Sequence, residues 1–111
     1  MYTSFWSHLS KRKAGIGIIL SNSFLSRFGF KANWIEVVPG RVCVLRLRGH
    51  CGSLDLAVCY LDASSSSERI DACSKLTRFL EPASEVLTMV FGDFNFVEHE
   101  VDRIDKASGK W

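Results

Sequence analysis

The fold is decided by residues 86–91, Val-Leu-Thr-Met-Val-Phe, which lead directly into Gly92-Asp93-Phe94-Asn95. A nearly continuous apolar run of this length predicts a strand that is covered on both faces. Such a strand needs packed layers on both sides of its sheet, and the remaining sequence offers a single clear helix. We therefore expect a mixed fold of the α/β (α+β) class, with this chain as the middle of a larger sandwich.

Strands are also expected upstream of this run. Two glycines, Gly15 and Gly17, lie in a β-branched segment, where close strand packing is a better explanation than a phosphate-binding loop. The segment at residues 54–60 alternates, so Leu54, Leu56, Val58 and Tyr60 should share one face. The strands expected before the deciding run are 14–20, 34–38, 41–48 and 54–60.

One helix is expected between the last two strands. Ser65 and Glu68 have the spacing of a capping box, which marks a helix start. Apolar residues then recur at helical spacing, at Ile70, Cys73, Leu76 and Leu80, and Pro82 ends the pattern. The sequence thus predicts about five strands and one main helix.

Charge is nearly balanced, with 14 Lys plus Arg against 12 Asp plus Glu, for a net charge of +2. This value alone does not indicate a nucleic-acid partner. Its distribution is uneven, because Lys11-Arg12-Lys13, Arg41, Arg46 and Arg48 make the first half basic while residues 81–105 are rich in acids. A surface that suits a polyanion and a merely solvated surface both fit this pattern.

The cysteines argue against a disulfide-linked partner. Cys43, Cys51, Cys59 and Cys73 form no CxxC pair and lie in predicted strand or helix, so small buried residues in a reducing compartment are expected. No signal peptide is visible, and the apolar runs are far shorter than the roughly 20 residues that span a bilayer. We expect a soluble, intracellular protein without a membrane partner.

The end of the deciding strand carries the candidate chemistry. Asp93 and Asn95 are two residues apart, so an extended backbone projects both side chains to one side. Phosphoester hydrolysis needs a carboxylate that orients water and uncharged donors that hold phosphoryl oxygens, and this pair supplies one of each. Gly92 would permit close backbone approach. An ordinary turn rich in Asp and Asn is the alternative.

Residues 13–111 resemble the endonuclease/exonuclease/phosphatase superfamily, which has the DNase-I-like fold. The closest resemblance is to the endonuclease domains of non-LTR retrotransposons. It rests on the order and spacing of several short motifs, namely residues 14–18, Gly40-Arg41, Tyr60, residues 66–69, Gly92-Asp93-Phe94-Asn95 and Asp102-Arg103. The resemblance implies a portion of the four-layer DNase-I-like α/β sandwich.

The resemblance also implies an activity: magnesium-dependent hydrolysis of phosphodiester bonds in DNA. Asp93 would orient the attacking water, Asn95 would bind the scissile phosphate, and Tyr60 would contact the phosphate. Arg69 and Arg103 would touch the nucleic-acid backbone. A core position for Tyr60 and simple solvation for the two arginines are the alternatives. Kinship further implies a reverse transcriptase domain in the parent polypeptide and a nuclear location.

The sequence departs from the family pattern at both ends. The family places an Asn and a metal-binding Glu on strands before residue 14, and a Ser-Asp-His-type motif after residue 111. His8, His50 and His99 do not occupy equivalent positions, and residues 1–12 form a poorly assigned lead-in. Residues 1–111 are therefore expected to be a partial domain, weakly active or inactive by itself. A phosphoesterase for phosphoinositides or other phosphoesters, and a non-catalytic remnant or interaction protein, are the alternatives.

Overall fold

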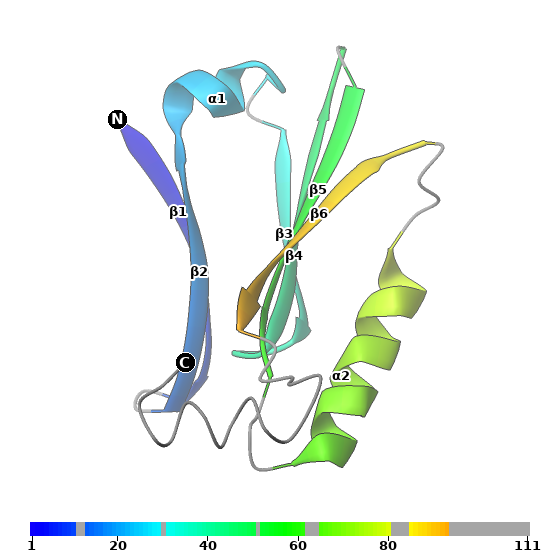
Figure 1. Cartoon of the computed structure of the whole chain (residues 1–111). Helices are drawn as coiled ribbons and strands as arrows, with labels where there is room; N and C mark the ends of the chain where they lie inside the picture. The colour runs from blue at the N-terminus through cyan, green and yellow to red at the C-terminus, as the bar shows by residue number, and fades with distance from the viewer. Residues whose placement is uncertain (11–12, 30, 51, 62–64, 81–84, 94–111) are drawn as a thin grey trace, which may run out of the picture.

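The computed structural model describes residues 1–10, 13–29, 31–50, 52–61, 65–80 and 85–93 of the chain. In these ranges the chain forms six strands in two sheets and two helices, so the expected mixture of α and β structure is confirmed (Figure 1). Neither of these helices has the length and apolar composition needed to cross a membrane.

The first sheet is a hairpin that the sequence predicts only in part. Strand β1 (Tyr2–Ser10) pairs antiparallel with β2 (Lys13–Ser21). Residues 1–12, which the sequence leaves poorly assigned, thus contain a strand. The glycine prediction is confirmed, because a Cβ atom at Gly17 would run into the Trp6 ring and one at Gly15 would meet His8.

The second sheet has the strand order β3-β4-β5-β6. Its first three strands are antiparallel neighbours and β6 joins β5 in parallel, so all four strands lie where the sequence predicts strands. Before β3, Ser21 caps a short helix, α1 (Asn22–Ser26), which lies between the strands predicted at 14–20 and 34–38. The strands are β3 (Ala32–Val38), β4 (Val42–Gly49), β5 (Gly52–Tyr60) and β6 (Leu87–Asp93).

The four-stranded sheet lies between the hairpin and the helix α2 (Ser66–Phe79), as Figure 1 shows. On the hairpin side, Leu45, Leu47 and Leu56 form a buried cluster with Leu25 of α1. On the helix side, the buried residues are Val42, Val44, Ala57, Cys59, Leu61, Ala72 and Leu76. Removal of this apolar surface from water is the main stabilising contribution to the stack.

Polar contacts fix the hairpin on the sheet. The Trp34 Nε1 group donates to the Trp6 carbonyl at 3.1 Å, and the Gly40 amide donates to the Ser7 hydroxyl at 2.7 Å. Ser7 is buried, so this second bond satisfies a polar group that would otherwise be costly to desolvate. The two sheets are therefore joined at both ends of β3.

Helix α2 begins as its sequence predicts. The Ser65 hydroxyl accepts a hydrogen bond from the Glu68 amide at 3.2 Å, which satisfies one of the amides left unpaired in the first turn. The predicted apolar face is wrong at Ile70, which is 67% exposed. Of the other predicted residues, Leu76 is buried against the sheet, and Cys73 and Leu80 pack partly against it. Ala72, which is not in the predicted face, is also buried there.

Strand β6 differs most from the prediction of a strand covered on both faces. Leu87 is 65% exposed and Phe91 is 45% exposed. The reason is its place in the sheet, since within the described ranges β6 pairs with β5 alone and forms an edge. An exposed apolar edge strand offers unpaired backbone groups to another strand and is a site of association in soluble proteins.

Candidate functional site

The candidate site lies at the carboxyl ends of β5 and β6. Tyr60 is the last residue of β5 and Asp93 is the last residue of β6. The two are direct neighbours in the parallel register, so their side chains start from the same face of the sheet. Beyond them, the Leu61 amide donates to the Asp93 carbonyl at 2.9 Å. Ligands of α/β sheets commonly bind outside such strand ends.

Gly92 sets how closely the two strand ends approach. It has φ 141°, a conformation that favours glycine, and a Cβ atom at this position would overlap with the Cys59 carbonyl. The prediction that Gly92 permits a close backbone approach is confirmed. The approaching group is the neighbouring strand β5, which places Asp93 beside Tyr60.

Tyr60 is accessible and held in place. Its side chain is 41% exposed, so the alternative of a core aromatic is wrong. The Arg41 guanidinium lies over its ring, with Cζ 5.2 Å from the centroid, and the Tyr60 amide donates to the Arg41 carbonyl at 2.7 Å. A cation–π contact of this kind contributes roughly 0.5–1 kcal/mol at an exposed site. The structure thus adds a cation to the site that the sequence does not assign there.

The other predicted site residues are placed less completely. Arg69 lies near the start of α2, the helix that follows β5, and its amide donates to the Ser65 carbonyl at 3.2 Å. Its side chain is partly buried, which differs from a fully solvated arginine. Asn95 and Arg103 lie outside the described residues. Of the predicted set, the structure brings together Tyr60 and Asp93.

The described residues do not form a complete metal site. No group of three or more His, Cys, Asp or Glu side chains that could hold a metal ion occurs in them. Magnesium sites in phosphoryl-transfer proteins often use one or two carboxylates, several waters and the substrate phosphate. The exposed carboxylate of Asp93 fits one position of such a set, and a full set would need further ligands.

The cysteine nearest to the site is not a nucleophile at neutral pH. Cys59, the register partner of Gly92, is buried, and burial raises its pKa to about 11, with smaller contributions from Cys73 and Cys43. Burial also raises the pKa of Cys43. Thiolates are the reactive form, so both thiols stay inert. The expectation of small buried cysteines is confirmed for Cys43 and Cys59; Cys73 is half-buried, and Cys51 lies outside the described residues.

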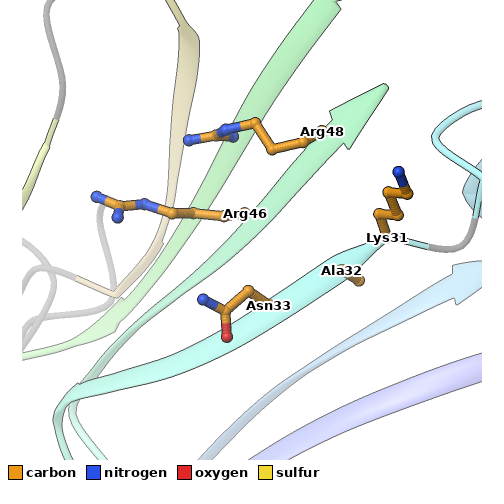
Figure 2. A pocket seen from close by; sticks show the side chains of 5 residues that line it. All are labelled: Lys31, Ala32, Asn33, Arg46 and Arg48. Atoms are coloured by element: carbon orange, nitrogen blue, oxygen red, sulfur yellow. The ribbon is translucent and has the colours of Figure 1, made fainter. Parts of the chain in front are cut away.

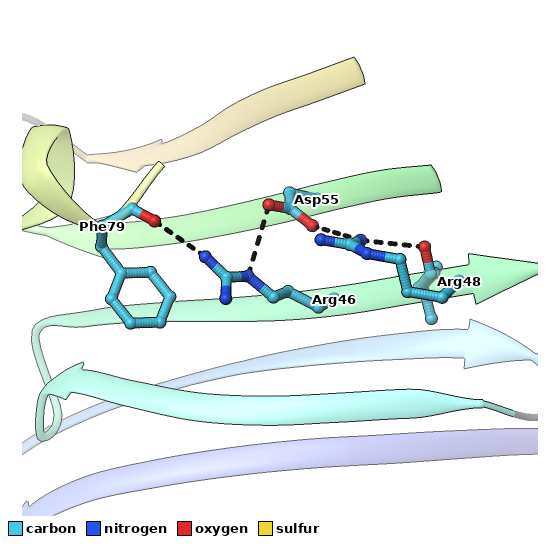
Figure 3. A network of polar contacts seen from close by, with 5 residues as sticks. Arg46, Arg48, Asp55 and Phe79 are labelled. Atoms are coloured by element: carbon cyan, nitrogen blue, oxygen red, sulfur yellow. Dashed lines mark hydrogen bonds and ion pairs between the residues drawn. The ribbon is translucent and has the colours of Figure 1, made fainter. Parts of the chain in front are cut away.

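A buried ion-pair network that is not predicted from the sequence lies between β4 and β5. Asp55 is fully buried, and its two carboxylate oxygens contact Arg48 at 2.8 Å and Arg46 at 3.5 Å (Figure 3). Arg46 also donates to the Phe79 carbonyl at 2.8 Å. The sequence holds one signal of this network. Asp55 lies two residues before Ala57 in an alternating strand, so both side chains share one buried face, where a carboxylate needs a partner.

The strand ends combine groups that are suited to a phosphate ester. An exposed carboxylate accepts a hydrogen bond from water, a phenol hydroxyl donates to a phosphoryl oxygen, and a nearby guanidinium favours negative charge. In this structure these groups are Asp93, Tyr60 and Arg41. Comparison of the chain with known protein families, with curated proteins and with solved structures finds no match.

Proposed function

We propose that the chain is part of a metal-dependent phosphodiesterase domain that cleaves nucleic acid, of the endonuclease/exonuclease/phosphatase type. The observation that carries the proposal is the pairing of Tyr60 with Asp93 at adjacent carboxyl strand ends. The motif Gly92-Asp93-Phe94-Asn95 and the other short motifs that resemble retrotransposon endonucleases support the same assignment.

In this proposal each residue has one task. Asp93 orients a water molecule and accepts its proton as the water attacks phosphorus, while the P–O bond to the leaving sugar oxygen breaks and that oxygen takes a proton from solvent. Tyr60 donates a hydrogen bond to a non-bridging oxygen, where negative charge develops in the transition state. Arg41 holds the Tyr60 ring in position. A magnesium ion, with ligands contributed from outside the described residues, would polarise the phosphoryl group.

The exposure of β6 supports the part of the proposal that concerns a partial domain. A strand with apolar side chains on both faces is typical of a sheet interior. Here Leu87 and Phe91 on one face and Val90 on the other remain accessible. Further strands and a further layer against β6 would bury them, and we propose that the parent domain supplies both.

The proposal predicts that nicking of a supercoiled plasmid in magnesium depends on Asp93. We expect slow nicking by the purified chain and a loss of at least about 100-fold on Asp93→Ala, the usual contribution of a positioned general base. The matched control is Asp71→Ala, which removes an exposed carboxylate on α2 that pairs with Lys75. This control should keep the full rate. Equal nicking by the Asp93→Ala chain would show that Asp93 has no part in the reaction.

A further inference from the structure

A second polar surface lies at the opposite end of the sheet from Asp93. The chain enters β3 and leaves β4 at this end, and two open hollows of about 380 and 540 Å³ adjoin each other there. Both hollows are lined by Lys31 and Arg48; Arg46 lines the first and Arg27 the second. Among the described residues, no Asp or Glu lines either hollow. We call Arg27, Lys31, Arg46 and Arg48 the basic surface.

The basic surface gathers four positively charged side chains. Asp55 lies buried beneath it and contacts both Arg46 and Arg48. Lys31 and Arg27 are exposed at its rim. The net charge of the entire chain is only +2. Positive charge is therefore concentrated at this end of the sheet, where it raises the local concentration of anions.

Two side chains of the basic surface, Arg46 and Arg48, are held in fixed positions. Arg46 lies over the Phe79 ring, with Cζ 4.3 Å from the centroid, and Arg48 donates to the Leu47 carbonyl at 3.1 Å as well as to Asp55. Figure 2 shows that both side chains extend to the same side of the sheet as the amide of Asn33. Groups that are already ordered lose less entropy on binding, and a planar guanidinium matches the geometry of phosphate.

We infer that the basic surface, with the Asn33 amide, binds the phosphodiester backbone of a nucleic acid without reading its bases. Several cations spread over two adjoining hollows fit a chain of phosphates better than one phosphate ion. Lysine, arginine and asparagine are common ligands of backbone phosphates. The inference does not depend on the proposed cleavage, because Arg48 pairs with Ser53 at the start of β5, whereas Asp93 pairs with Tyr60 at its other end.

Fluorescence anisotropy with a labelled duplex of about 20 base pairs, in EDTA so that no cleavage occurs, tests this inference. The variant combines Arg27→Glu with Lys31→Glu, since both side chains are exposed and neither change disturbs the buried Asp55. We expect the affinity to fall at least about tenfold and the slope of log K against log salt to decrease by about two. Circular dichroism checks that the variant is folded.

One control separates this surface from net charge. The combination of Lys75→Glu with Arg78→Glu makes the same charge change on exposed residues of α2 and should leave the affinity within about twofold. Equal weakening by both charge-reversal pairs would overturn the inference, as would displacement of the duplex by inorganic phosphate at low millimolar concentration, which would indicate a single-phosphate site.

Discussion

Asp55→Asn is expected to lower the free energy of unfolding by about 3 kcal/mol, near the lower end of the range for breaking a buried ion pair. The side chain of Asp55 is 0% exposed, and its charge is balanced by Arg46 and Arg48, whose side chains are 22% and 34% exposed. The amide keeps the size of the carboxylate but not its charge. Because the arginines retain access to water, the cost should stay below the maximum for a fully buried pair.

Urea unfolding with an unchanged m-value measures this cost. The matched control is Asp71→Asn, because Asp71 forms an exposed pair with Lys75 at 3.0 Å and should contribute less than about 0.5 kcal/mol. If the free energy of unfolding of Asp55→Asn lies within about 0.5 kcal/mol of that of the unmodified chain, the network does not stabilise the fold. In that case Asp55 does not hold Arg46 and Arg48 in fixed positions.

Gly92→Ala is expected to destabilise the chain by about 4 kcal/mol, with two separate causes. The first is the φ of 141°, which an alanine adopts only with strain, and the second is overlap of the new Cβ atom with the Cys59 carbonyl. Relief of the overlap requires β6 to move away from β5. We therefore expect faster hydrogen exchange at the β6 amides and separation of Asp93 from Tyr60.

Gly52→Ala isolates the first cause. Gly52 has φ 139°, almost the same value, but a Cβ atom there would have nothing within 4 Å. This variant should cost about 2 kcal/mol, the contribution of backbone strain alone. Equal losses of stability for the two variants would mean that the close approach of β5 and β6 at Gly92 contributes nothing.

Local features of the sequence predict local features of the structure well. The Ser65 cap, the packing role of Gly15 and Gly17, and the close approach at Gly92 each depend on a few neighbouring atoms, and each is found in the structure. The pairing of Tyr60 with Asp93 also follows from two strands that end near each other. Each of these features depends on local backbone geometry, and the residue type directly limits that geometry.

Features that depend on distant partners are not predicted. Strand β1 places Phe5 and Ser7 toward the sheet and Trp6 outward, so its apolar pattern is not that of a strand with one buried face. Its hairpin position is set by contacts with β2 and β3. The same reason explains β6, whose apolar sequence indicates burial although its place at the sheet edge leaves it accessible. Asp55 is explained only by its contacts with Arg46, its register partner, and with Arg48.

We propose that Asp93, beside Tyr60, directs cleavage of a nucleic-acid phosphodiester. Hydrolysis in magnesium of a duplex with an abasic site and of an inositol phosphate should be measured for the unmodified chain and for its Asp93→Ala variant. We expect the unmodified chain to cleave the duplex in preference to the inositol phosphate and Asp93→Ala to abolish this cleavage. Preferred hydrolysis of the inositol phosphate, or duplex cleavage that persists in the variant, would show that the proposal is wrong.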